Sequence, residues 1–94
     1  PTGLLASNVS NAGAQLSWNE VAGADIYKVY RKLSTDEGYA LVATSTIPTA
    51  SIAGMQDGKS YHVRVSAVNG KGESEFSDTV VIHTKQATFK YDFG

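Results

Sequence analysis

The chain has 94 residues, a formal net charge of −1 and no cysteine, which is enough for one domain with one modest core. The near-neutral charge disfavours nucleic-acid binding, which depends on an excess of Lys and Arg. The missing cysteines exclude disulfides, thiolate zinc sites and a cysteine nucleophile. The longest apolar runs are far shorter than the roughly 20 residues of a membrane helix, so we expect no membrane insertion.

Apolar and polar residues alternate with a period of two along most of the chain, which is typical of half-buried antiparallel strands. In residues 14–19 the apolar residues are Ala14, Leu16 and Trp18, and the polar residues that alternate with them are expected to form the solvent-exposed side of the strand. The alternation and the turn signals between segments predict about seven strands. These are residues 4–8, 14–19, 25–33, 39–44, 50–53, 61–69 and 79–84.

Glycine and asparagine punctuate the predicted strands, at residues 11–13, 21–23, 36–38, 56–58 and 69–72. These residue types supply the positive φ angles that tight turns require. Residues 34–37 match the sequence pattern of a helix capping box. However, Gly38 follows directly and no apolar residues recur at helical spacing after it, so we expect a hairpin loop there. Residues 70–74 are expected to form the turn after the sixth strand. We expect one domain over residues 1–85 and a linker, or the start of a following module, over residues 86–94.

Four segments in order resemble a fibronectin type III domain: Leu16-Ser17-Trp18, Tyr27-Lys28-Val29-Tyr30, the run from Gly54 to Asn69, and Gly70-Lys71-Gly72-Glu73-Ser74. The resemblance covers about residues 1–84 and implies an all-β, seven-stranded, two-sheet antiparallel sandwich of the immunoglobulin-like class. In that family the position of Tyr61 carries a tyrosine corner, whose hydroxyl reaches upstream backbone. Met55 stands where the family usually has Leu, which is a tolerable match in volume.

The inner layer of such a sandwich is expected to contain the apolar residues of the alternating segments. The structural core should include Trp18, Tyr27, Val29, Met55, Tyr61, Val63 and Val65. Leu4, Leu16, Ile52 and Ala67 should join them, with Val80 or Ile82 from the last strand.

No constellation for catalysis, metal binding or a cofactor is found in the sequence, and none is expected. A nucleophile needs a base and a group that orients it, yet His62 and His83 are both expected to face solvent. Glycosidase chemistry needs two carboxyl groups facing each other across a cleft, whereas the carboxylates here are scattered over loops and the tail.

One face is a candidate for ligand binding. If Tyr27 and Val29 face inward, then Lys28, Tyr30, Lys32, His62 and Arg64 share the outer face of one sheet. An aromatic ring can stack on a sugar, and cations pair with uronate carboxylates, so contact with an acidic polysaccharide is one interpretation. The alternative, which we favour, is a solvated face whose long basic side chains discourage edge pairing.

The resemblance, together with a tail (Lys90-Tyr91-Asp92-Phe93-Gly94) similar to the opening of modules in bacterial polysaccharide-degrading enzymes, suggests a secreted multidomain parent. The chain is therefore expected to be a non-catalytic spacer, extracellular or at the cell surface, monomeric, and partnered by neighbouring domains of the same polypeptide. The alternative is a module that binds carbohydrate or protein through an exposed sheet face or loops.

Overall fold

The computed structural model describes residues 1–85, so the predicted linker at 86–94 lies outside the described residues. Eight strands are present over the described part: β1 (Leu5–Ser7), β2 (Ala14–Ser17), β3 (Ile26–Leu33), β4 (Ala40–Ser45), β5 (Thr49–Ile52), β6 (Ser60–Asn69), β7 (Gly72–Glu73) and β8 (Val80–His83). Residues 1–85 contain no helix, and hence none of the length and apolarity that a bilayer crossing requires.

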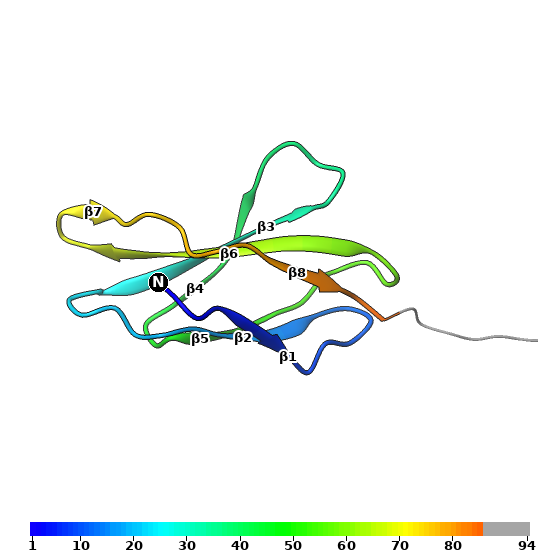
Figure 1. Cartoon of the computed structure of the whole chain (residues 1–94), viewed down its shortest axis with the longest axis horizontal. Coiled ribbons are helices and arrows are strands. Elements are labelled where there is room, and N and C mark those ends of the chain that lie inside the picture. The colour runs from blue at the N-terminus through cyan, green and yellow to red at the C-terminus, as the bar shows by residue number, and fades with distance from the viewer. Residues whose placement is uncertain (86–94) are drawn as a thin grey trace, which may run out of the picture.

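Two antiparallel sheets face each other across the molecule (Figure 1). The smaller sheet has the order β1-β2-β5. The larger sheet has the order β4-β3-β6-β7, and β8 also pairs with β6. The predicted all-β sandwich is therefore confirmed, and the strand pairs within residues 1–85 are all antiparallel.

The structure has eight strands where seven were predicted, because the last strand of the sandwich is divided. β7 pairs with the Val68–Asn69 end of β6, and β8 pairs with the Ser60–Val63 end of β6. Residues 70–74 are therefore not a single long turn as expected. Only Gly70 and Lys71 form the turn, and β7 follows it at once.

The apolar side chains of both sheets meet in one core between the layers. The buried hydrophobic residues are Leu4, Ala14, Leu16, Trp18, Tyr27, Val29, Ile52, Met55, Tyr61, Val63, Val65, Ala67 and Ile82. They come from β2, β3, β5, β6 and β8 and from the adjoining loops. Because side chains alternate with a period of two, every second residue of these strands points into the core. The space between the sheets is filled, so a partner could contact only the outer faces and the loops.

Three of the predicted turn glycines, Gly13, Gly38 and Gly70, lack the positive φ that was expected, and one of them has a different role. Gly58 does have a positive φ, of 67°, as the turn interpretation requires. Gly13 does not, and a Cβ there would lie 2.2 Å from the backbone oxygen of Ile52. Gly13 is therefore needed for the close approach of two backbones rather than for a left-handed conformation.

Candidate functional site

The outer face of the larger sheet carries the five residues predicted from the sequence as a ligand face. In the β3–β6 ladder Tyr30 lies opposite Arg64, and Lys32 lies opposite His62. Directly paired residues lie on the same side of a sheet, and Lys28 shares that side because it precedes Tyr30 by two positions. All five side chains are half-buried. The structure therefore brings them together on one exposed face, which we call the outer face.

Two aromatic rings enclose the guanidinium group at the middle of the outer face. The Cζ atom of Arg64 lies 3.9 Å from the centroid of the Tyr39 ring and 3.7 Å from that of Phe76. Tyr30 meets Phe76 edge to face, with 5.2 Å between ring centroids. Cation–π attraction is strongest at such short distances, so these four side chains hold one another in place as a stack.

The position of Arg64 within this stack limits the bonds that its guanidinium can make. Its Nε atom is buried and has no hydrogen-bond partner among the described residues. Both ring centroids lie within 4 Å of its Cζ atom, so a ligand can reach the guanidinium only where the rings do not cover it. The outer face therefore offers a fixed, partly covered cation rather than a mobile one.

A carboxylate from β7 neutralises part of the outer face. The hydroxyls of Tyr30 and Ser66 both donate to Oε2 of Glu73, the former at 2.8 Å. The hydrogen bond from Ser66, then that from Tyr30, and the charge of Lys28 hold the pKa of Glu73 below its ordinary value. The hydrogen bond to the Glu73 carboxylate raises the pKa of Tyr30, helped by burial.

Lys32 is tied to the loop beside the stack. Its Nζ atom donates to the backbone oxygen of Asp36 at 3.1 Å and lies 5.6 Å from the centroid of the Tyr39 ring. Lys28 and His62 make no hydrogen bond of this kind among the contacts of the described residues. The basic residues of the outer face are thus unequal, because Arg64 and Lys32 are held by direct contacts, whereas Lys28 acts on Glu73 through its charge.

The two histidines lie on the outer face, His62 on β6 and His83 on β8. His83 pairs with Ser60 across the β6–β8 ladder, and the Ser60 hydroxyl lies 2.7 Å from its Nδ1 atom. No carboxylate completes this pair into a triad within the described part of the chain, and triad chemistry needs that third group. No group of three or more His, Cys, Asp or Glu side chains in residues 1–85 could hold a metal ion.

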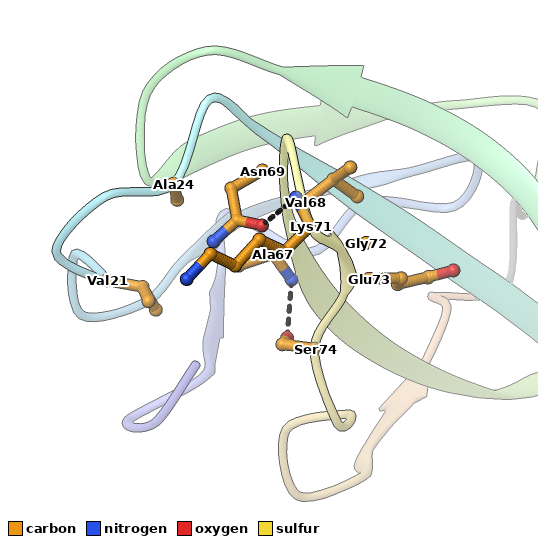
Figure 2. Close-up of a pocket in the computed structure, with 9 residues that line it drawn as sticks. All are labelled: Val21, Ala24, Ala67, Val68, Asn69, Lys71, Gly72, Glu73 and Ser74. Atoms are coloured by element: carbon orange, nitrogen blue, oxygen red, sulfur yellow. Dashed lines mark hydrogen bonds between the residues drawn. The ribbon is translucent and has the colours of Figure 1, made fainter.

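A hollow of about 220 Å³ lies at one end of the sandwich, between the loop before β3 and the β6–β7 hairpin. Figure 2 shows Val21 and Ala24 on one side of it and the Asn69 and Lys71 side chains on the other. Glu73 is the only carboxylate among its lining residues. Acid–base catalysis by a pair of carboxyl groups is therefore not available in this hollow.

Sequence reasoning missed Tyr39, Phe76 and Glu73 as parts of the outer face. Tyr39 precedes β4, Phe76 lies between β7 and β8, and Glu73 ends the two-residue strand β7. None of them belongs to a long alternating run, which was the signal used to assign residues to a face. The aromatic residues near Arg64 in the folded sheet are distant from it in sequence, so no local pattern pointed to them.

Comparison with known proteins gives a consistent family assignment. The family model described as "Fibronectin type III domain" matches residues 1–83. A poly(3-hydroxybutyrate) depolymerase from Ralstonia pickettii is 36% identical over 88 residues, which are 93% of this chain and 17% of that protein. The chain thus spans less than a fifth of the length of this relative.

Solved structures agree on the architecture. The crystal structure of domains A168–A170 from titin is 28% identical, with a TM-score of 0.84, and the match covers 92% of this chain and 32% of that one. An Fn3-like protein from Clostridium thermocellum is 30% identical, with a TM-score of 0.76, and the match covers 97% of this chain and 95% of that one.

Proposed function

The chain belongs to the fibronectin type III family, and from that premise we propose that it is a non-catalytic spacer in a secreted, polymer-degrading enzyme. The observation that carries the proposal is its relationship to a short segment of a much longer depolymerase. A domain that occupies a small part of an enzyme, and whose own core is filled, acts on its neighbours by position. Its partners are the neighbouring domains of the same polypeptide, and it works as a monomer outside the cell.

The mechanism is mechanical. Figure 1 shows the N-terminus left of the middle of the sandwich and the end of β8 near the right-hand end of its long axis. A rigid body with this arrangement keeps the domains on either side a fixed distance apart. That separation sets the effective concentration of a catalytic domain at a substrate that another domain has bound. The named relative degrades a polyester, so a polysaccharide and a polyester are both candidate substrates for the parent enzyme.

The rigidity of the spacer can be tested with spin labels, because the chain has no cysteine of its own. The double variant Thr2→Cys/Lys85→Cys places one label near each end, at two exposed positions. A rigid spacer gives one narrow distance distribution by double electron–electron resonance. The distribution should be unchanged by salt, because the core rather than surface charge maintains the distance.

The control for this experiment is the pair Thr2→Cys/Gln15→Cys, whose second label lies within the smaller sheet at an exposed position. This control measures how much the flexibility of the labels themselves broadens the distance distribution. A Thr2–Lys85 distribution much broader than the control, or one with several maxima, would contradict the spacer mechanism.

A second candidate function is binding through the outer face, and the fixed Arg64 guanidinium between two rings favours it. Lys28 and the imidazole of His62 lie on the same face as this guanidinium, so the ligand chemistry is a uronate-containing polysaccharide. Titration with pectin fragments, followed by NMR, should shift the resonances of Tyr30 and Arg64 if this function is real. If these resonances do not shift at millimolar ligand, the binding function is contradicted and only the spacer function remains.

A further inference from the structure

Asn69 and Gly70 lie side by side at the tip of the β6–β7 hairpin, and both are exposed. Asn69 is the last residue of β6 and pairs with Gly72 of β7. The side-chain oxygen Oδ1 of Asn69 accepts a hydrogen bond of 2.8 Å from the backbone N–H of Lys71 (Figure 2). The amide side chain is therefore held against the backbone of the turn that follows it.

The nitrogen of Gly70 is accessible to this amide group. No Cβ shields it, and a Cβ built at this position would meet no atom within 4 Å outside the two neighbouring residues. Within residues 1–85 the Gly70 N–H takes part in no hydrogen bond of the turns, loops or side chains. The N–H of Lys71 draws electron density from the Asn69 carbonyl and could stabilise negative charge on its oxygen, as an oxyanion hole does.

We propose that Asn69–Gly70 is a self-modification site at which the folded chain converts asparagine to aspartate and isoaspartate. The Gly70 nitrogen loses its proton to hydroxide and attacks Cγ of Asn69, which forms an N–Cγ bond and a tetrahedral oxyanion. Collapse of that intermediate breaks the Cγ–Nδ2 bond; the departing NH₂ group takes a proton from water and leaves as ammonia, which regenerates the hydroxide. Water then opens the five-membered succinimide at either carbonyl, so that no oxidant, reductant or enzyme is required.

The other asparagines of the described chain are internal comparators. Asn8, Asn11 and Asn19 are also exposed, but Val, Ala and Glu follow them. A side chain on the following residue hinders approach of its nitrogen, whereas glycine presents none. Exposure is thus shared by all four asparagines, and the glycine distinguishes Asn69.

Asp57–Gly58 is a second pair that could form a succinimide, and its structure argues against reaction. The N–H of Gly58 donates to the backbone oxygen of Lys85 at 3.3 Å, which hinders its deprotonation. A carboxylate is also a poorer electrophile than an amide. Reaction is therefore expected at residue 69 and not at residue 57.

The product places a new carboxylate in the hollow at the end of the sandwich, which Asn69 lines together with Lys71. The chain becomes more negative by one charge for each converted molecule. The isoaspartate product also adds one methylene to the backbone where β6 ends, and so changes the Asn69–Gly72 pairing. The site thus alters both the charge and the geometry of this hairpin without any partner.

Peptide mapping by mass spectrometry tests the proposal on the intact, folded chain. Trypsin releases residues 65–71, VSAVNGK, in one peptide, and Asn8, Asn11 and Asn19 in another. After incubation at mildly alkaline pH, the first peptide should gain about 1 Da and split into two chromatographic forms. The rate should rise in proportion to hydroxide concentration, and the second peptide should stay unchanged over the same period.

Gly70→Ala is the matched control, because a Cβ at this position meets no atom within 4 Å beyond the adjacent residues and Gly70 does not have a positive φ. Its conversion should be severalfold slower at unchanged thermal stability. Equal rates in both proteins, conversion spread evenly over the four asparagines, or conversion of Asn69 only after unfolding in urea would each overturn the proposal.

Discussion

At the scale of single residues, two tyrosine hydroxyls fasten loops to the core in the same way. Tyr61 accepts a hydrogen bond of 2.7 Å from the backbone N–H of Gln56, which is the corner that the family resemblance implied. Tyr27 accepts one of 2.9 Å from the backbone N–H of Val21. The second contact was not predicted, since it spans the loop before β3, for which the sequence offers no such motif.

Replacement of Tyr61 by Phe tests the first of these contacts. The ring remains in the core, but the N–H of Gln56 loses its acceptor in a partly buried place. A polar group left unpaired on folding costs about 1–3 kcal/mol, and we expect a loss in the free energy of unfolding of that size. Urea denaturation measures it.

Tyr39→Phe is the control, because the Tyr39 hydroxyl is exposed and lies 3.5 Å from Thr79 Oγ1 at its one contact. It should change stability by much less. A Tyr61→Phe variant as stable as the control would show that the corner contributes nothing.

The hydrogen bonds that Ser66 and Tyr30 donate to Glu73 predict a dependence of stability on pH at both ends of the scale. The folded state lowers the pKa of Glu73, so its contribution is complete at neutral pH and is lost as the pH falls through about 4 and below. The folded state raises the pKa of Tyr30, so its contribution is complete at neutral pH and is lost as the pH rises beyond about 10.

Urea midpoints measured across this pH range for the native chain and for Glu73→Gln check the prediction. The variant should show a shallower loss of stability in acid, because the amide does not titrate. Tyr30→Phe should remove the part of the stability loss at alkaline pH that comes from ionisation of Tyr30. Identical profiles for the native chain and Glu73→Gln would contradict the assignment of the acid limb to Glu73.

At the scale of elements, serine side chains continue the last strand across the gap between β7 and β8. The hydroxyl of Ser77 accepts the backbone N–H of Val65, while its own N–H donates to the Val65 oxygen. Ser74 forms the same pair of bonds with Ala67. These hydroxyls replace backbone acceptors of the ladder, so the divided strand leaves these N–H groups of β6 satisfied.

Ser77→Ala is expected to destabilise the fold. The hydroxyl that accepts the Val65 N–H is lost in a buried setting, and an orphaned buried donor costs about 1–3 kcal/mol. Thermal denaturation should show a lower midpoint. Ser51→Ala, at an exposed position of β5, serves as the control and should lie within about 0.5 kcal/mol of the native chain. Equal midpoints for the two variants would refute the role of the hydroxyl.

The position of β4 was predicted closely from the sequence, but its register with β3 was not. The segment 39–44 was predicted as a strand, and β4 is found at Ala40–Ser45. Its pairing with β3 shifts between Val29 and Tyr30, so that Val42 and Ala43 both pack against the core. Simple alternation would place these neighbours on opposite faces, and a bulge of this kind follows from the fit to β3 rather than from a local pattern.

At the scale of the whole molecule, Trp18 joins the two layers. It is 6% exposed, and its ring meets the ring of Tyr27 from the larger sheet, with 5.4 Å between centroids. Trp18→Ala should lower the free energy of unfolding by roughly 3–5 kcal/mol, since it leaves a cavity between the sheets.

Guanidinium denaturation measures the effect, and Leu5→Ala is the control because that side chain is 66% exposed. A cost for Trp18→Ala no larger than that of the control would mean that the layers do not depend on this contact.

The sequence by itself determined the two-sheet architecture and which side of each long strand is buried in the core. The pleat of a strand turns neighbouring side chains to opposite sides, so a period of two in hydrophobicity already encodes which side is buried. Only the tertiary structure decided that Tyr39 and Phe76 enclose Arg64 and that Glu73 joins Tyr30 and Ser66. These contacts depend on how loops and short strands cross the outer face, and that path is set by the pairing of β6 with β3 and β8, which are distant in sequence, and by the β6–β7 hairpin.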